Sequence, residues 1–492
     1  MPARQITARA QAPEPIQAGI AALRAELEVP DDFSPEVVAA AEQAAAHGVD
    51  EARWQLGERV DRTDLDFVTI DPEGSKDLDQ AMCLERLTDG FLVWYAIADV
   101  AAWVEPGGAV DLEAHRRGQT FYAPAERAPL HPAVLSEGAA SLLADGRPRP
   151  ALLWRIELDA AGAQRAASVQ RALVRSREQL TYAGVQAQLD AGTAPEWVGL
   201  LREIGQLREQ QEVERGGVSL NLPEQEIVSD EDGWHTEFRC PLPIEGWNAQ
   251  VSLLTGMAAA SIMLQAQTGI LRTLPPAQQR DVERLRGIAR GLRIDWPEQM
   301  GYPDFVRSLD VTRPTHLAMM TSCTRLFRGA AYTVLGQADQ DGEAPSGDAL
   351  KHNALAAHYA HCTAPLRRLV DRYVGEICVH LCNQTEIPQW VLDALPTLPD
   401  EMRESDSRAK KFERGIVDLT EALVLSSHTG RRLEGVVVDH DPKKDQGTIS
   451  IAEPAVEARF QMPGVALGQE VAVEVDSVDL LKGVVTFRPA AS

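Results

Sequence analysis

The stretch DFVTIDPEGSKDLDQA, residues 66–81, places Asp71, Asp77 and Asp79 around a glycine turn directly after an apolar run. The run DFVTI predicts a β-strand with Asp71 at its end, a position where side chains are often functional. Asp77 and Asp79 face the same way in an extended segment, because a single residue separates them. Carboxylates this close repel one another, and a hard cation such as Mg²⁺ or Mn²⁺ is the usual compensation. On spacing alone, a solvated acidic turn with Asp77 capping a helix is the more common explanation.

The predicted secondary structure changes several times along the chain around this stretch. Short β-rich runs between turns continue to about residue 175 and predict strands. Helical stretches then dominate to about residue 425, including 248–267, 277–293 and 365–383. After about residue 430, five short strands fit a small Greek-key barrel of the OB type. The sequence therefore predicts an α+β multidomain protein.

The first 60 or so residues are predicted to form a small helical module, such as a helix-turn-helix. Ser34 is a good N-cap for a helix with Pro35 at its first position, and Gly48 is a plausible C-cap. The module holds little Lys or Arg, so it carries no sign of DNA recognition.

Composition narrows the classes of protein. The net charge is −25, from 48 basic and 73 acidic residues, which argues against a general polyanion binder but allows a local basic channel. The start of the chain has no apolar core typical of a signal peptide, and the most apolar helical stretch, VSLLTGMAAASIML, is too short to span a bilayer. We expect a cytoplasmic protein without a membrane segment.

The six scattered cysteines are expected to be buried thiols rather than zinc ligands.

A second motif is HYAHCTAPLRRLVDRYV, residues 358–374. Pro365 is expected to open a helix, with Arg367 and Arg368 in its first turn. Cations there oppose the helix dipole, and a bound phosphate would reconcile the two. Asp371 lies at helical spacing from both arginines, so a local ion pair explains the pattern equally well.

A third motif is RRGQTFYAPAERAPLHP, beginning at Arg116. Phe121 and Tyr122 stand between basic residues, with Arg117 before them and Arg127 after them. An aromatic side chain between cations can stack on a nucleobase while the arginines hold phosphate. Core packing is the alternative and the more common role of a lone aromatic pair.

The three motifs occur in this order, together with YAIADVAAWVEPGGAVDLEAHRRGQTFYAP, HPAVLSEGAASLLADGRPRPAL and KHNALAAHYAHCTAPLRRLVDRYV. The combination resembles the ribonuclease II (RNB) family of exoribonucleases over roughly residues 60 to 425. The last part resembles the S1-type OB domain that ends many members. The resemblance implies an RNB catalytic domain at 61–428, with a β-sheet core surrounded by helices, and an S1 domain at 429–492. The helical N-terminal module at 1–60 precedes them and is predicted from the residues alone.

The resemblance also implies a function. Members are processive 3′→5′ hydrolytic exoribonucleases that release nucleoside 5′-monophosphates from single-stranded RNA in RNA decay. The implied cofactor is Mg²⁺, with Mn²⁺ as an alternative, the implied partner is single-stranded RNA, and the expected state is a monomer.

Roles for individual residues follow from the resemblance. Asp71 and Asp77 match metal-binding aspartates, and Asp79 matches the aspartate most critical for hydrolysis, which holds metal and the attacking water. Tyr122 matches the aromatic that stacks on the 3′-terminal base. Arg367 matches the arginine that contacts the scissile phosphate and stabilises its developing charge.

Two further residues are assigned to RNA binding. Arg368 is expected to contact RNA beside Arg367. Glu413, in KKFERGIVDL, aligns with a family glutamate near the exit of the product.

The chain departs from the family pattern in two places. Gln80 stands where most members have a fourth aspartate, and we expect it to join the metal site through a water held by its carbonyl group. The number of metal ions stays open at this point. About 60 helical residues replace the family's cold-shock OB domains, so the RNA entrance is expected to differ.

Three functions follow. The leading hypothesis is an active Mg²⁺-dependent exoribonuclease. The second is a catalytically weakened RNB protein that binds RNA without cleaving it, which Gln80 alone favours. The third is a different metal phosphoesterase that acts on DNA or small nucleotides, since recognition of the 2′-hydroxyl cannot be located in the sequence.

Overall fold

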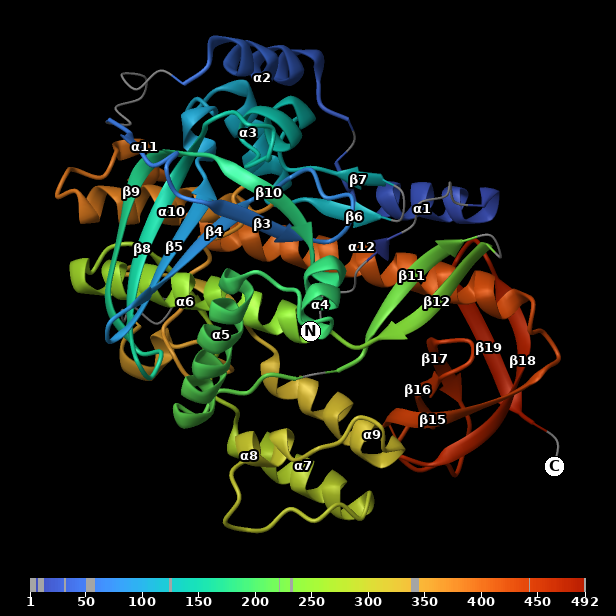
Figure 1. Ribbon diagram of the computed structural model, residues 1–492. Coiled ribbons are helices and arrows are strands. Elements are labelled where there is room, and N and C mark those ends of the chain that lie inside the picture. The colour runs from blue at the N-terminus through green and yellow to red at the C-terminus, as the bar shows by residue number, and fades with distance from the viewer. Residues whose placement is uncertain are drawn as a thin grey trace.

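The computed structural model describes residues 6–7, 13–30, 32–49, 58–123, 126–220, 222–230, 233–337, 345–441 and 443–490. A seven-stranded sheet with strand order β10-β3-β4-β5-β8-β9-β2 forms the centre of the catalytic body (Figure 1). Pairing is antiparallel except between β10 and β3 and between β2 and β9. The strands are β2 (Val60–Asp61), β3 (Phe67–Asp71), β4 (Gln80–Leu87), β5 (Gly90–Ala98), β8 (Arg149–Asp159), β9 (Gln164–Val174) and β10 (Ser176–Thr181).

The central strand β5 is apolar along its whole length because both faces of the sheet are covered. Its odd-numbered residues from Phe91 to Ile97 pack against helices on one face. Its even-numbered residues from Leu92 to Ala98 pack against a second layer. The first face is covered by α5 (Glu196–Glu214), α6 (Pro243–Ala266) and α10 (Leu369–Cys382), and the second by α2 (Pro35–His47) and α3 (Ala109–Arg117).

The remaining helices and strands surround this body (Figure 1). The strands of the 176–425 region were not predicted, because short strands between long helices leave little periodic signal. The helices are α1 (Glu14–Glu26), α4 (Tyr182–Asp190), α7 (Gln279–Gly291), α8 (Tyr302–Arg307), α9 (Pro314–Cys323), α11 (Gln389–Ala394) and α12 (Leu398–Ser426). The strands are β1 (Ile6–Thr7), β6 (Phe121–Ala123), β7 (Glu126–Ala128), β11 (Glu224–Asp230), β12 (Gly233–Arg239), β13 (Ile270–Thr273) and β14 (Ala331–Val334).

The N-terminal helices have the predicted caps but not the predicted arrangement. The Ser34 hydroxyl accepts a hydrogen bond from the Val37 amide at 3.3 Å, and Gly48 ends α2 with a positive φ of 72°. However, α1 packs on α12, where Gly19 lies against Leu419, whereas α2 packs on α3. The two helices therefore form no helix-turn-helix, because their apolar faces are buried against different parts of the catalytic body. Part of the predicted 1–60 module, including residues 50–57, lies outside the described residues.

The C-terminal region forms the predicted five-stranded structure. Its strand order is β17-β16-β15-β18-β19, and its apolar side chains enclose one core that Leu425 of α12 joins. The helix α12 runs from beside the sheet to this barrel (Figure 1). The strands are β15 (Arg432–Asp441), β16 (Gln446–Ile451), β17 (Val456–Gln461), β18 (Glu470–Asp479) and β19 (Val484–Pro489).

The apolar helix α6 is longer than the stretch singled out in the sequence. It has 24 residues, and its most apolar 18-residue window has a mean hydropathy of 1.3, so by length and composition alone it could cross a membrane. Half of its most apolar window is buried inside the protein, where it packs on α5 and α10, and the core helix of a globular protein passes the same test.

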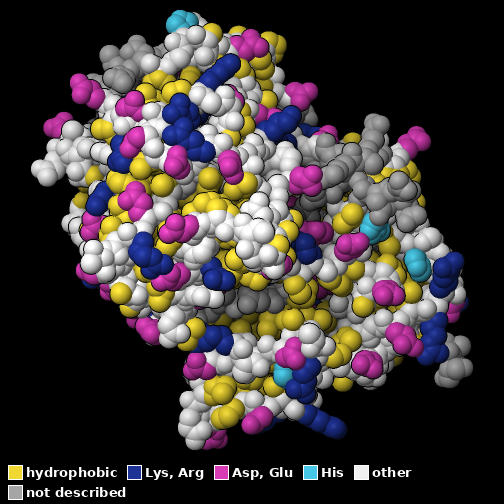
Figure 2. Space-filling model, in the orientation of Figure 1, with side chains coloured by type: hydrophobic (Ala, Val, Ile, Leu, Met, Phe, Trp, Pro, Cys, Tyr) yellow, Lys and Arg dark blue, Asp and Glu magenta, His cyan; other side chains and the backbone are white. Residues whose placement is uncertain are grey.

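Lys and Arg side chains are scattered among Asp and Glu over the face shown in Figure 2.

The cysteines are all free. Cys323, Cys362 and Cys378 are buried as predicted. The prediction is wrong for Cys240, which is exposed on the short link between β12 and α6.

Candidate functional site

The acidic loop between β3 and β4 has a fixed backbone. Asp71 is the last residue of β3, as predicted, and Gly74 turns the chain with a φ of +83°. The Ser141 hydroxyl donates to the Lys76 carbonyl at 2.6 Å and accepts from the Leu78 amide at 3.0 Å. These two bonds lie on either side of Asp77, so they hold that residue in place from a neighbouring loop.

The second motif is a turn rather than the start of a helix. The helix α10 begins at Leu369, so the prediction that Pro365 opens it is wrong. The Thr120 amide donates to the Arg367 carbonyl at 3.0 Å, and the Leu369 amide donates to the Gly118 carbonyl at 3.0 Å. Because this strand-like pairing uses the backbone of residues 367–369, the helix cannot start earlier. The same pairing ties this turn, residues 365–368 and called the arginine turn below, to the segment that leads into Tyr122.

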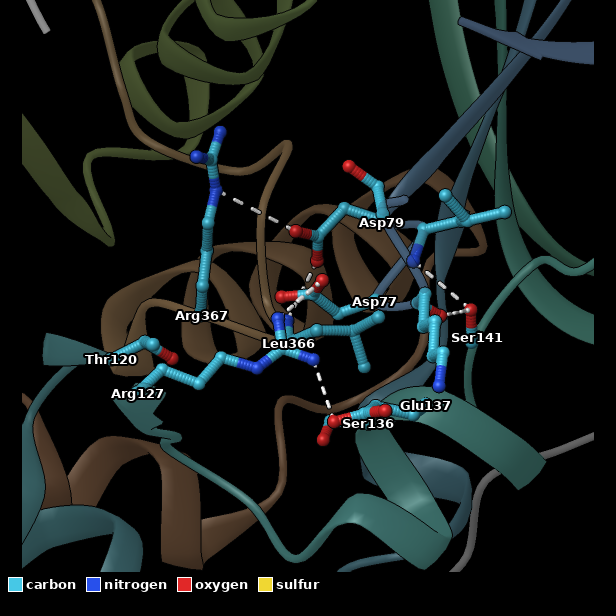
Figure 3. A network of polar contacts seen from close by, with 12 residues as sticks. Asp77, Asp79, Thr120, Arg127, Ser136, Glu137, Ser141, Leu366 and Arg367 are labelled. Carbon is cyan, nitrogen blue, oxygen red and sulfur yellow. Dashed lines mark hydrogen bonds and ion pairs between the residues drawn. The ribbon is translucent and has the colours of Figure 1, made fainter. Parts of the chain in front are cut away.

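Asp79 joins the acidic loop to the arginine turn (Figure 3). Its Oδ1 accepts a hydrogen bond from the Leu366 amide at 2.7 Å, and its Oδ2 lies 3.6 Å from Arg367 Nε. The Asp79 side chain is 8% exposed, whereas the Arg367 side chain is 52% exposed. Burial raises the pKa of Asp79 well above its usual range, although Arg367 and the Leu366 amide oppose the shift. The site therefore has a buried carboxylate beside an accessible guanidinium.

Asp77 is held by an arginine that the sequence analysis had placed only beside the aromatic pair. Arg127 Nη1 donates to Asp77 Oδ1 at 2.7 Å, and Arg127 Nη2 donates to Glu137 Oε1 at 2.6 Å (Figure 3). Arg127 lies directly across the β6–β7 hairpin from Tyr122. Glu137 comes from a short π-helix, Leu135–Ala139, an irregular element that often occurs at functional sites. Neither contact had a local sequence signal, because each one joins separate segments of the fold.

Asp71 has an unpaired carboxylate oxygen. Its Oδ2 is buried with no hydrogen-bond partner among the described residues. Burial raises the pKa of Asp71 to about 7, with Arg367 opposing and Asp77 adding to the shift. An unpaired buried carboxylate oxygen is costly, and a bound cation would remove that cost.

The donor set fits a hard divalent cation, since it offers carboxylate oxygens and a free one at Asp71. Within the described ranges, however, no group of three or more His, Cys, Asp or Glu side chains is arranged to hold an ion as it stands. Asp77 and Asp79 lie next to each other but are engaged by Arg127 and Arg367. The fold brings the three predicted carboxylates into one site without converging them on one point.

The amide of Gln80 is bonded to groups other than the aspartates. Its Nε2 donates to the Thr363 carbonyl at 2.7 Å, and its Oε1 accepts from the Tyr95 hydroxyl at 2.6 Å. The Thr363 side chain also accepts from the Ser252 hydroxyl of α6 at 3.0 Å. The amide of Gln80 therefore links β4 to the loop that leads into the arginine turn.

The remaining predicted residues are Arg368, Tyr122 and Glu413. Arg368 makes two hydrogen bonds to Asp371, the local ion pair that the spacing allowed. Tyr122 is half-buried, and burial raises its pKa. Glu413 is half-buried on α12. Its neighbour Phe412 shares a core cluster with Phe121 of the β6–β7 hairpin.

Comparison with known proteins gives a consistent result. The RNB domain model matches residues 59–384, and the model of the RNase II-type exonuclease C-terminal S1 domain matches residues 431–490. Ribonuclease R of Vibrio cholerae is 26% identical over 445 residues, which cover 84% of this chain and 52% of the relative. The chain spans about half the length of the curated relatives it matches.

Two solved structures share the fold. Mycoplasma genitalium RNase R in complex with ribose methylated single-stranded RNA gives a TM-score of 0.83 at 18% identity, covering 97% of this chain and 78% of that chain. Yeast Ssd1, described as a pseudonuclease, gives a TM-score of 0.66 at 16% identity, covering 84% of this chain and 52% of that chain. The same fold therefore occurs both in a nuclease and in a protein described as a pseudonuclease.

Proposed function

Because the chain belongs to the ribonuclease II (RNB) family, we propose that it is a divalent-metal-dependent 3′→5′ exoribonuclease. It would degrade single-stranded RNA processively to nucleoside 5′-monophosphates. The observation that carries this proposal is the position of Asp79, which accepts from the Leu366 amide and lies 3.6 Å from Arg367 Nε. The two motifs that carry the resemblance, almost 290 residues apart in the chain, thereby meet around one buried carboxylate.

Arg367 is suited to binding the scissile phosphate. Half of its side chain is exposed, and its backbone is held by the Thr120 amide, so the guanidinium is accessible and its base is fixed. A guanidinium presents several donors to phosphate oxygens and keeps its charge at any physiological pH. In hydrolysis it would stabilise the negative charge that develops on the phosphate.

The aspartates Asp71 and Asp79 would hold the ion, with Asp77 contributing through the oxygen that Arg127 leaves free. Mg²⁺ is the proposed cofactor and Mn²⁺ its substitute, and either would, when bound, supply charge stabilisation and activation of water for phosphodiester hydrolysis. Asp79 would also orient the attacking water, since the Leu366 amide fixes its carboxylate.

Tyr122 would stack on the 3′-terminal base. Its strand leads directly from the segment paired with the arginine turn, so the aromatic ring and Arg367 are held in one framework. Stacking tolerates any base, which suits an enzyme that removes every nucleotide in turn. Arg368, paired with Asp371, would support RNA binding indirectly by bracing this turn.

A second candidate is an RNB protein that binds RNA without cleaving it. Gln80 favours it, because a neutral amide replaces a family carboxylate. The placement of Asp71, Asp79, Arg367 and Tyr122 favours the nuclease, since a protein released from catalysis has no need to keep them together.

The test is a cleavage assay on a 5′-labelled single-stranded RNA of about thirty nucleotides, a length that exceeds a typical single-strand site. Parallel reactions contain no divalent ion, the same sequence as DNA, or an RNA hairpin with a 3′ overhang. We expect Mg²⁺-dependent shortening of RNA alone from its 3′ end. Intact RNA that still shifts on a native gel would instead support the binding protein, and cleavage of DNA would support a broader phosphoesterase.

A further inference from the structure

Arg127 places a positive charge among Asp71, Asp77 and Asp79, which together form the acidic site. Its guanidinium lies between Asp77 and Glu137, with N–O distances of 2.7 and 2.6 Å. The three side chains are only 27%, 15% and 25% exposed, so solvent screens these ion pairs less than pairs on the surface. Arg127 therefore acts electrostatically on whatever binds at the aspartates.

The backbone around Asp77 does not depend on Arg127 for its position. The Ser141 hydroxyl bonds to the residues on both sides of Asp77, and the Leu142 amide donates to the Leu78 carbonyl at 3.0 Å. The guanidinium is thus not needed to shape the loop. Arg127 acts instead on the Asp77 side chain, to which it brings a hydrogen bond and a positive charge.

The charges of the site balance with one divalent ion. The charged side chains that interact across the site are four carboxylates and two guanidinium groups (Asp71, Asp77, Asp79, Glu137, Arg127 and Arg367). With all four carboxylates ionised, the state that a bound cation favours, two negative charges remain, and one divalent cation neutralises them. The adjacent Arg368–Asp371 pair adds no net charge. Gln80 adds none either, and its amide is bonded to Tyr95 and Thr363.

We propose that Arg127 is a built-in cation that stands at Asp77 where a second divalent ion would bind, so that the site takes a single ion. A second ion would have to approach a fixed guanidinium within a poorly screened site, and like charges at such distances repel strongly. This inference rests on the proposed function for its choice of ion. It concerns ion binding without RNA, so its failure can be told apart from a lack of nuclease activity.

The experiment counts Mn²⁺ bound per full-length chain by equilibrium dialysis, in the absence of RNA. The variants are R127Q, which removes the charge, and R127K, which keeps it. The matched control is R165Q, which removes an exposed arginine paired with Asp89 in the turn between β4 and β5. Thermal unfolding of each protein checks that the fold is retained.

We expect one Mn²⁺ in the wild type, R127K and R165Q, and two in R127Q, at free Mn²⁺ about tenfold above the wild-type dissociation constant. Two ions in the wild type would overturn the proposal whatever the variants do. Two ions in R127K, or one ion bound equally or less tightly in folded R127Q, would also overturn it. If R127Q does not fold, two ions in the wild type or in R127K would still overturn the proposal.

Discussion

Two clusters of carboxylates and arginines lie beside each other at the end of β5, and they are built differently. In the first, Asp99 follows β5 directly and lies 2.9 Å from Arg59 and 2.8 Å from Arg171. Arg171 also makes two hydrogen bonds to Glu376 of α10. All of these side chains are at most 2% exposed. Burial would raise the pKa of Asp99, but the two arginines outweigh burial and hold it below its usual range.

The second cluster is the acidic site, where the balance goes the other way. The pKa of Asp71 is raised to about 7 by burial, and that of Asp79 is raised well above its usual range. The two clusters are adjacent, since the Ala98 amide next to Asp99 donates to the Asp79 carbonyl at 2.9 Å. One end of the sheet therefore carries two kinds of cluster. In the first, the buried charges are paired and can stabilise the fold. In the second, burial of the carboxylates is not offset by ion pairs, and the cluster can bind a ligand.

The sharpest test of this contrast replaces the carboxylate at the centre of each cluster. Asp79→Asn keeps the shape of the side chain and removes a charge that burial already disfavours, so stability should not fall. Activity on single-stranded RNA should drop at least about 1,000-fold, the order expected when a group that stabilises the transition state is lost. RNA affinity, measured by filter binding, should stay within about threefold, since Tyr122 and Arg367 are intact. Near-normal turnover would remove Asp79 from its proposed role.

Asp99→Asn should have the opposite result. It leaves Arg59 and Arg171 buried without their shared carboxylate, and breaking a buried ion pair costs about 3–5 kcal/mol of unfolding free energy. Urea denaturation followed by tryptophan fluorescence measures the loss. The remaining folded fraction should cleave RNA at a normal rate per molecule. If stability were unchanged, the first cluster would not be the structural counterpart described above.

The sequence predicted the residues of the acidic site better than their arrangement, and it did not predict the Asp99 cluster. The strand at 67–71 with Asp71 at its end is confirmed, as is the five-stranded C-terminal structure, because local periodicity and turn residues specify strands. The role of Arg127 at Asp77 was not predictable, because it depends on a hairpin and a π-helix meeting the acidic loop in space. The start of α10 was mispredicted for a similar reason, since pairing with residues 118–120 overrides the proline signal at 365.

A raised pKa alone does not mark a ligand site, and Glu421 sharpens the comparison. This buried residue of α12 accepts hydrogen bonds on Oε1 from Gln225 at 2.9 Å and from the Glu457 amide of the barrel at 2.7 Å. Burial raises its pKa to about 7, against Arg414 and these two donors. Unlike Asp71, whose Oδ2 has no partner among the described residues, Glu421 has a bonded oxygen that a glutamine could reproduce.

Glu421→Gln should therefore stabilise the protein at high pH without affecting catalysis. Because the folded pKa lies above the unfolded one, Glu421 contributes its full stability below about pH 4.5, and this contribution is lost as pH rises to about 7. The variant should gain about 2 kcal/mol relative to wild type at pH 8, and much less at pH 5. Denaturation at both pH values measures the difference, and an equal effect at the two would show that Glu421 does not titrate in this range.

The smallest expected effect concerns Gln80, which the family pattern would place in the acidic cluster and which the contacts place in the scaffold. Gln80→Leu removes the bonds to the Thr363 carbonyl and the Tyr95 hydroxyl, and should cost about 1–2 kcal/mol of stability. The Mg²⁺ concentration for half-maximal cleavage should stay within about twofold, because no bond to the ion is lost. Gln179→Leu is the matched control, since Gln179 also donates to a loop carbonyl, that of Ser75, but on the exposed surface. A shift of the Mg²⁺ midpoint in Gln80→Leu alone would return Gln80 to the metal site, whereas lower stability with an unchanged midpoint would assign it to the support of the arginine turn.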